Sequence, residues 1–300
     1  MRVLFLGDRT AGVRSLDALA RENAIVGVVA HPTSSNNDAG DESVFEHASG
    51  AGFSTVRLKG RELELARFVR DARPDVLWIA DYGYLLPPEV LALAPLGAVN
   101  LHPSLLPHYR GRESIHWAIR NGERRIGLTA HFVNSGVDSG DIIAQQAIAL
   151  SEDDDIGSAL EKLHPIYARL SRDVAALLRT GSARAVPQAA GNWPHCPSLG
   201  PADREIDWSW SSQAVADFVR AWARPYPGAS TSLGGTPMTI WRARAGMPSG
   251  PGSVGSIWSV ERERFFVNCG IGSLEVLGYG TQGQLAPRVG DRFQTLDRAA

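Results

Sequence analysis

The chain has 300 residues, enough for one large domain or a large domain with a small one. It is 44% hydrophobic and 21% charged, as is typical of globular proteins, and no apolar run is long enough to span a bilayer. The net charge of -2 gives no overall attraction to nucleic acid or anionic membranes. Met1 leads directly into the strand-like run RVLFLG without a secretory signal pattern, so we expect a cytoplasmic protein. Cys196 and Cys269 have no ligand-like neighbours, which argues against a disulfide scaffold or a zinc site.

The first half of the chain alternates short apolar runs with amphipathic segments. The apolar runs, which predict buried strands, are residues 2–7, 24–30, 75–80 and 97–101. The segments with helical spacing are residues 11–23, 41–52 and 62–75. Continuous apolar strands that alternate with helices are typical of a mostly parallel sheet covered on both faces, so we expect an α/β domain.

The pattern changes in the second half. Two longer strands at 126–134 and 141–150 should flank a turn, and a helix over 155–180 should close the first domain. Few apolar positions are periodic in the Pro-rich stretch that follows, which predicts a linker. A helix and short strands with Gly-rich turns then predict a small antiparallel barrel or sandwich. The expected division is a domain at 1–180, a linker at 181–205 and a second domain at 206–300.

The stretch VNLHPSLLPHYRGRESIHWAIRNGE places polar groups directly after a predicted buried strand. Ligands of open parallel sheets bind outside the carboxyl ends of the strands. Residues i and i+2 of an extended chain share a face, so Asn100 and His102 can point into one pocket. Taken singly, Asn100 could instead cap the turn, and His102 could be a buried histidine bonded to the backbone.

A second polar group follows the predicted strand at 126–134, in the turn SGVDSGD that holds Asp138 and Asp141. His131 lies within that strand. DSGD is also a good turn sequence in its own right, and His131 could be a satisfied core histidine. The run GDRTAG after the first strand lacks both the glycine spacing of a dinucleotide fingerprint and the lysine of a phosphate loop, which argues against a nicotinamide cofactor.

Together, an amide, an imidazole and a carboxylate suit acyl transfer to a nucleophile that the substrate carries. The N–H groups of the amide and the imidazole can donate to an oxyanion. The carboxylate can hold the imidazole or accept a proton from an attacking amine. Ser104 is present, but HPSLLP is not a nucleophile elbow of the G-x-S-x-G kind.

Several motifs in this region resemble those of the 10-formyltetrahydrofolate-dependent formyltransferases. They are NLHPSLLP at 100–107, YRG at 109–111, GLTAH at 127–131 and VDSGD at 137–141. DVLWIADYGYLLPPEVL before them, and REIDW and VRAWARPYPGAST after them, extend the resemblance over nearly the whole chain. The resemblance implies a Rossmann-like domain followed by an oligonucleotide-binding (OB)-like β-barrel, with 10-formyltetrahydrofolate as co-substrate and no metal.

The resemblance also implies roles for individual residues. Asn100 would bond the formyl oxygen, His102 would stabilise the oxyanion, and Asp138 would keep His102 charged and take the amine proton. His131 would support them. The residues implied for the folate pocket are Ile79, Tyr82, Leu85, Leu86, Pro87, Val137 and Asp141. Those implied for the acceptor are Ser104, Tyr109, Arg110 and Trp117, and Arg112 is a further candidate.

The acceptor is implied to be a small-molecule amine, foremost a nucleotide-linked aminosugar, with hydroxyornithine of siderophore synthesis as the alternative. The stretch HPTSSNNDAGDESVFEHA at 31–48 stands where the methionyl-tRNA enzyme has a basic insertion, and it has no Lys or Arg. Phosphate contacts dominate nucleic-acid affinity, so this stretch argues against tRNA. The glycinamide ribonucleotide enzyme lacks the C-terminal barrel. A formyltetrahydrofolate hydrolase and a non-catalytic binding module remain open, and a homodimer is common for such enzymes.

Overall fold

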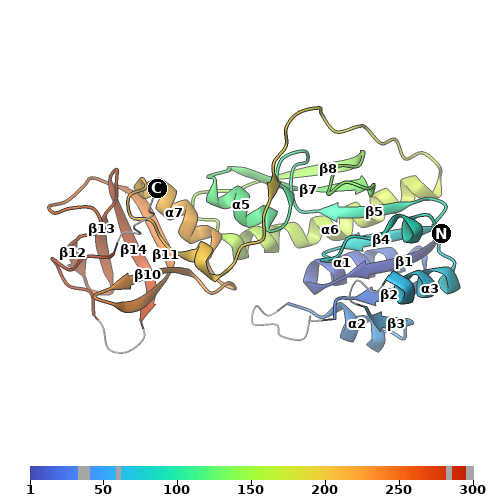
Figure 1. Ribbon diagram of the computed structural model, residues 1–300, viewed down its shortest axis with the longest axis horizontal. Coiled ribbons are helices and arrows are strands. Elements are labelled where there is room, and N and C mark those ends of the chain that lie inside the picture. The colour runs from blue at the N-terminus through green and yellow to red at the C-terminus, as the bar shows by residue number, and fades with distance from the viewer. Residues whose placement is uncertain (33–40, 59–61, 282–285, 295–300) are drawn as a thin grey trace. The chain divides into compact units, whose positions relative to one another are not determined.

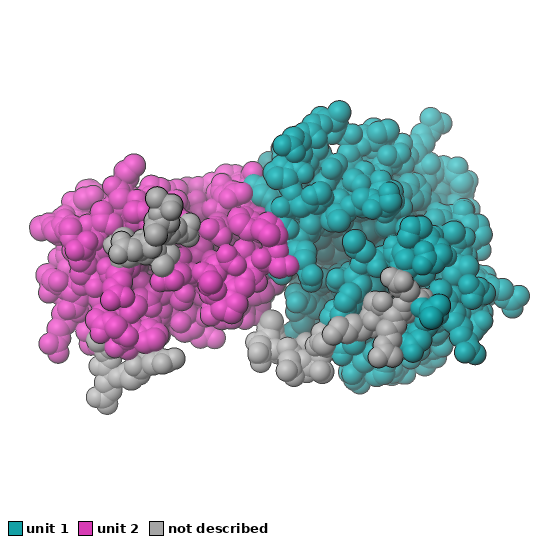
Figure 2. All heavy atoms as spheres, in the orientation of Figure 1, with its two compact units in different colours: residues 1–114, 125–149, 160–196 teal, residues 115–124, 150–159, 197–300 magenta. Residues whose placement is uncertain are grey.

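The computed structural model describes residues 1–32, 41–58, 62–281 and 286–294. The chain forms two compact units, coloured separately in Figure 2. Unit 1 comprises residues 1–114, 125–149 and 160–196, and unit 2 comprises residues 115–124, 150–159 and 197–300. The predicted linker is therefore divided, because its residues up to 196 pack with unit 1 and the rest pack with unit 2. In the described part of the chain, no helix is both long and apolar enough to cross a membrane.

Unit 1 is built on a seven-stranded sheet in the order β3-β2-β1-β4-β5-β7-β8 (Figure 1). Its parallel strands are β1 (Arg2–Gly7), β2 (Ala24–Ala30), β3 (Thr55–Arg57), β4 (Val76–Ala80) and β5 (Ala98–His102). The last two, β7 (Arg125–Phe132) and β8 (Ile142–Ala149), run antiparallel to their neighbours. The predicted mostly parallel sheet is confirmed, and β1 and β2 have the predicted bounds.

Helices follow most of these strands. They are α1 (Arg9–Ala20), α2 (Val44–Gly50), α3 (Glu62–Ala72), α4 (Pro88–Leu91), α5 (Ser114–Arg120) and α6 (Ile156–Arg179). The central strands are mostly apolar, and Val3 to Leu6 of β1 and Val76 to Trp78 of β4 have no exposed surface. Burial of each such side chain stabilises the fold by about 1.5–3 kcal/mol, which explains why continuous apolar runs predicted these strands well.

The carboxyl ends of three neighbouring strands meet at one edge of the sheet. Gly7 at the end of β1 pairs with Ala80 at the end of β4, and Ala80 pairs with Leu101 of β5. The residues that follow these strands therefore share one edge, as expected for ligand sites in open parallel sheets.

Unit 2 contains a five-stranded antiparallel sheet in the order β10-β11-β14-β13-β12. Its elements are α7 (Ser212–Ala221), β10 (Ala229–Leu233), β11 (Thr236–Met247), β12 (Ile257–Glu261), β13 (Arg264–Asn268) and β14 (Ser273–Thr281), preceded by the 3-10 helix η1 (Pro201–Arg204). The chain near Phe293 bonds beside both edge strands, because Phe293 N donates to Gly255 O at 2.9 Å and Gln294 N donates to Ser232 O at 3.3 Å. The predicted antiparallel domain is confirmed.

A buried ion pair holds α7 within unit 2. Arg220 and Asp217 are 7% and 4% exposed, and Arg220 donates to the Asp217 carboxylate. Arg220 Nη1 also donates to the carbonyl of Asp154 at 2.6 Å, and Gln213 Nε2 donates to Asp217 at 3.1 Å. Each buried charge thus has hydrogen-bonding partners, as a buried pair requires.

Candidate active site

The pairing of β5 with β7 brings together residues that are about thirty positions apart. Asn100 is directly opposite His131, and His102 is directly opposite Thr129. Directly opposite residues of an antiparallel pair project from the same face of the sheet. Asn100, His102 and His131 therefore lie side by side at the carboxyl end of β5.

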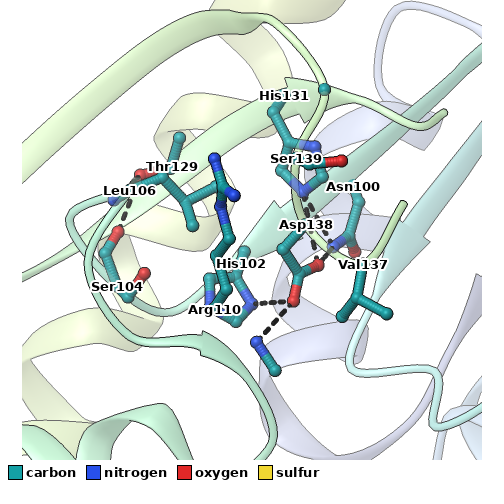
Figure 3. A network of polar contacts seen from close by, with 12 residues as sticks. Asn100, His102, Ser104, Leu106, Arg110, Thr129, His131, Val137, Asp138 and Ser139 are labelled. Atoms are coloured by element: carbon teal, nitrogen blue, oxygen red, sulfur yellow. Dashed lines mark hydrogen bonds and ion pairs between the residues drawn. The ribbon is translucent and has the colours of Figure 1, made fainter. Parts of the chain in front are cut away.

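The turn between β7 and β8 adds a carboxylate to this group. Asp138 lies at its centre, with the left-handed φ of +47° that only a held turn maintains in a non-glycine residue. Its oxygen Oδ2 accepts from Gly111 N at 2.9 Å and lies 3.5 Å from His102 Nδ1. Its oxygen Oδ1 accepts from Asn100 Nδ2 at 3.3 Å and lies 3.6 Å from His131 Nε2 (Figure 3). One carboxylate thus joins all the predicted catalytic side chains.

His102 has an acceptor oxygen beside each ring nitrogen. Nε2 lies 2.8 Å from the carbonyl of Tyr109, and Nδ1 faces Asp138. Burial is the largest influence on the pKa of His102 and lowers it below the usual value, against the raising effect of the Asp138 carboxylate and the Tyr109 carbonyl. Burial thus favours the neutral imidazole, whereas the Asp138 carboxylate favours the charged ring that the resemblance implies. Only the imidazolium can donate to both oxygens, so the ring is placed to take up a proton during a reaction.

Asp138 is ionised in this setting. Burial raises the pKa of its carboxyl, but the neighbouring His102 and His131 rings and the Gly111 N–H lower it more, so the pKa lies well below the usual range. Hydrogen bonds to the charged form of a carboxyl favour ionisation in this way. A fixed negative charge therefore lies beside His102 near neutral pH.

The contacts of His131 define the orientation of the Asn100 amide. His131 Nδ1 donates to the carbonyl of Phe132 at 2.8 Å, so its Nε2 accepts from Asn100 Nδ2 at 3.1 Å in the neutral ring. The Asn100 amide nitrogen thus serves both His131 and Asp138. A substrate oxygen that accepts from this nitrogen must share it with these partners or replace one of them.

The turn after β5 is held by a small buried network. Thr129 Oγ1 donates to the carbonyl of Ser104 at 2.7 Å, and the Ser104 hydroxyl donates to the carbonyl of His108 at 2.8 Å. Gln145 Nε2 donates to Thr129 Oγ1 at 2.8 Å and to the carbonyl of Leu106 at 3.0 Å. Ser104 is 3% exposed and bonds within this turn, which positions the chain between His102 and Gly111.

The residues expected at the folate pocket differ in their exposure. Ile79, Tyr82 and Leu86 are 6%, 8% and 8% exposed and belong to the core of unit 1, whereas Leu85 is 75% exposed. Burial raises the pKa of Tyr82 to about 12, and its hydroxyl donates to the carbonyl of Leu58 at 3.3 Å. The backbone between β4 and α4 forms neither helix nor strand, so its polar groups are not used in a regular ladder.

This segment and the turn that holds Asp138 suit a pterin. A pterin needs apolar walls and hydrogen-bonding groups along one edge. Leu85 and the half-buried Val137 offer apolar surface, and the irregular backbone before Pro87 offers donors and acceptors. The Asp141 side chain is exposed, and its carbonyl accepts from Phe132 N at 2.9 Å, which closes the hairpin. Among the described residues, no group of three or more His, Cys, Asp or Glu side chains could hold a metal ion.

The residues expected to meet the acceptor lie in different places. Tyr109 has a φ of +57° and offers its carbonyl to His102. Arg110 donates from Nε and Nη2 to the side chain of Gln188 at 3.1 and 2.6 Å. Trp117 groups with unit 2, where its indole N–H donates to the carbonyl of Pro197 at 3.0 Å. Gln188 was not predicted, because it lies in the Pro-rich stretch without any periodic signal.

An amide, an imidazole and an ionised carboxylate that lie together at the end of a parallel strand are the arrangement expected of an acyl-transfer enzyme whose nucleophile comes with the substrate. The two family comparisons agree with this class. Residues 1–169 match the formyl transferase family, and residues 198–286 match the formyl transferase C-terminal domain. The chain belongs to the formyl transferase family, and it is therefore a formyltransferase whose formyl donor is 10-formyltetrahydrofolate.

Relatives and solved structures are similar over almost the full chain. Methionyl-tRNA formyltransferase of Pelotomaculum thermopropionicum is 32% identical over 297 residues, which cover 97% of this chain and 94% of that protein. The enzyme of the same name from Anaeromyxobacter dehalogenans strain 2CP-C is 35% identical, over 91% and 89% of the two chains. An N-formyltransferase of Helicobacter canadensis, solved with folinic acid and dTDP-3-aminofucose, has the same fold with a TM-score of 0.69, 16% identity and coverage of 91% and 98%.

Proposed function

We propose that this formyltransferase acts on the primary amine of a small molecule, foremost a nucleotide-linked aminosugar, with Asn100, His102 and Asp138 as its catalytic residues. The observation that carries the proposal is the single Asp138 carboxylate that contacts Asn100, His102 and the Gly111 N–H. The folate supplies the activated formyl group when bound. The attacking amine forms the new C–N bond, and the bond from the formyl carbon to the folate nitrogen breaks.

Each catalytic residue has a task that follows from its contacts. Negative charge develops on the formyl oxygen during attack, and the Asn100 N–H can donate to it, as can a protonated His102 when one of its N–H groups leaves its protein acceptor. The attacking amine must lose a proton, and His102 in its neutral form can accept it, because the oxygens beside its two ring nitrogens stabilise the protonated ring. Asp138 stays ionised and stabilises the imidazolium that forms. The leaving folate nitrogen receives the proton back, which balances the transfer.

Charge at the carboxyl edge of the sheet supports a small amine over tRNA. Arg9 Nε lies 4.0 Å from Asp41 and 3.7 Å from Asp81, and Arg14 pairs with Glu42 at 2.6 Å. These basic side chains have acidic partners, whereas a phosphate backbone needs unpaired Lys and Arg. Residues 33–40 of the stretch without Lys or Arg lie outside the described residues.

Two aromatic rings at the same edge support a nucleotide-linked acceptor. The His31 and Tyr84 rings stack with centroids 5.0 Å apart and planes 10° apart, and both are half-buried. Half-buried aromatic faces accept a nucleobase by stacking. Arg112 is exposed beside Gly83, and a diphosphate would pair with such a guanidinium. Hydroxyornithine, the alternative, would use the acidic side chains in place of these groups.

A second candidate is methionyl-tRNA, which the 32–35% identity to methionyl-tRNA formyltransferases over almost the whole chain favours. The test is a formyl-transfer assay with 10-formyltetrahydrofolate and four acceptors, namely nucleotide-linked 3- and 4-aminosugars, N-hydroxyornithine and methionyl initiator tRNA, beside a reaction with buffer alone. Tetrahydrofolate release is followed by absorbance, and the formylated product by mass spectrometry.

The assay separates the candidates. Turnover with an aminosugar, and none with the His102→Ala enzyme, is the expected result. Turnover with tRNA alone would replace the small-molecule acceptor by the second candidate. Folate release with buffer alone would mean that water is the acceptor, and the chain would then be a hydrolase.

A further inference from the structure

The Pro-rich stretch that follows α6 belongs to unit 1 as far as residue 196. Its residues 186–196, here called the strap, are fixed at both ends. Val186 and Ile142 of β8 exchange backbone hydrogen bonds of 2.9 and 2.8 Å. At the other end, β9 (His195–Cys196) pairs in parallel with β6 (Arg110–Gly111). The strap thus pairs with β8, which follows the turn that holds Asp138, and with β6, whose Gly111 N donates to Asp138.

Gln188 lies between these two anchors and uses its amide fully. Oε1 accepts from Arg110 Nε and Nη2 at 3.1 and 2.6 Å. Nε2 donates to the carbonyls of Asp138 and Gly140, both at 2.8 Å. The orientation of the amide follows from these partners, because a turned amide would place its oxygen against two carbonyls and its nitrogen against a guanidinium.

The turn that Gln188 holds has a conformation that needs support. Asp138 has a φ of +47°, and a side chain at Gly140 would collide with the carbonyl of Phe132. A left-handed aspartate persists only where its surroundings fix it. Gln188 bonds the backbone on both sides of Ser139, so it fixes the direction in which the Asp138 carboxylate points.

The strap also pairs with the segment that holds Gly111, a further partner of the Asp138 carboxylate. Gly111 N donates to Asp138 Oδ2 at 2.9 Å, and Gly111 pairs with Cys196 of the strap. Arg110 precedes Gly111 and is held by Gln188. The turn and the β6 segment are therefore tied to the same eleven-residue segment, with Gln188 as the side chain that contacts both.

We propose that Gln188 is a positioning residue for formyl transfer: it sets the Asp138 carboxylate against His102 and Asn100 and does not contact substrate. The proposal rests on the proposed function of the site. A displacement of about 1 Å at a catalytic group can cost about a hundredfold in rate, and loss of an outer partner typically costs about 10–100-fold.

The test compares four proteins: wild type, Gln188→Ala, Gln188→Glu and Asn192→Ala. Gln188→Ala removes the hydrogen bonds with Arg110 and those with the carbonyls of Asp138 and Gly140. Gln188→Glu keeps an acceptor for Arg110 but sets a carboxylate against the two carbonyls of the turn. Asn192 carries an exposed amide on the same strap and serves as the matched control.

We expect kcat to fall about 10–100-fold in both Gln188 variants, with the KM values for folate and amine within about threefold of wild type. Asn192→Ala should match wild type. A rise in KM at unchanged kcat would mean that Gln188 acts on substrate binding through Arg110, and would overturn the positioning role. Wild-type kinetics in Gln188→Ala would overturn the positioning role as well. So would a fall in kcat that is fully explained by a smaller fraction of folded protein.

Hydrogen exchange gives a readout that does not depend on activity. Amides of residues 134–141 should exchange faster in Gln188→Ala than in wild type, while Asn192→Ala leaves them unchanged. If the wild-type chain transfers no formyl group, the proposed function fails. The exchange measurement still tests whether Gln188 holds the turn that contains Asp138. Unchanged exchange of residues 134–141 in Gln188→Ala would overturn the positioning role of Gln188, even where the enzyme is active.

Discussion

The charge of Asp138 can be tested by the isosteric change Asp138→Asn. The carboxylate accepts on both oxygens, from Gly111 N at 2.9 Å and from Asn100 Nδ2 at 3.3 Å. An amide has one oxygen, so its NH₂ group must face one of these donors unless Asn100 turns over. A buried donor without its acceptor costs about 1–3 kcal/mol, so we expect a stability loss of this size.

The catalytic loss should exceed this structural cost. The variant removes the negative charge beside His102 that stabilises the imidazolium formed during transfer. Loss of such acid–base support lowers the rate by about 10²–10⁴-fold. The measured quantity is kcat/KM for formyl transfer to the amine that the acceptor assay identifies. Thermal unfolding followed by circular dichroism confirms that the variant is folded.

The control is Asp71→Asn, which changes an exposed carboxylate on α3 that has no part in the candidate site. We expect it to retain activity within about threefold of wild type. A folded Asp138→Asn enzyme with near-normal kcat/KM would refute the catalytic role of this charge.

Three further outcomes follow from single contacts. The folded pKa of Asp138 lies below the unfolded value of about 3.9, so its ionised carboxyl stabilises the fold above that pH; urea unfolding should show wild type losing its advantage over Asp138→Asn as pH falls towards 2. Gly111→Ala places a Cβ 2.7 Å from the backbone of β9 at a φ of +96°, so kcat/KM should fall about tenfold or more, whereas Gly97→Ala, at a φ of +77° in open space, should cost only stability. Arg220→Met leaves Asp217 buried without its charge partner, which should cost about 3–5 kcal/mol in the free energy of unfolding. Replacing both residues by apolar ones should restore most of this stability, and an equal loss in the double variant would contradict the role of the unpaired charge.

Several strands that sequence reasoning located consist of residues that require burial. β1 at Arg2–Gly7 is apolar after its first residue, so its pattern was sufficient. β9 has only two residues and forms because β6 is its neighbour, a contact that no local pattern expresses. β3 and β10 were missed for a similar reason, since their alternation is short or mixed with Ser and Thr.

The candidate site was predictable to the extent that it depends on strand geometry. Asn100 and His102 share a face because they are two residues apart in β5, and this required only the period of a strand. The contact between Asp138 and His102 joins residues 36 positions apart, and motif resemblance, not periodicity, selected it. The partner of Arg110 was not predicted, because an isolated glutamine in a Pro-rich stretch carries no signal of what it will bond.

The order of these parts along the chain has a consequence for biosynthesis. Asn100, His102 and Asp138 have all been synthesised well before Cys196, the last residue that pairs with the β6 segment. During translation, the three side chains can therefore be folded near one another while Gly111 and the Asp138 turn still lack their hydrogen bonds with the strap. A nascent chain or a fragment that stops at residue 180 would carry the three proposed catalytic residues, yet the Asp138 turn and the Gly111 segment would lack their contacts with residues 188 and 196 until the ribosome has added sixteen more residues.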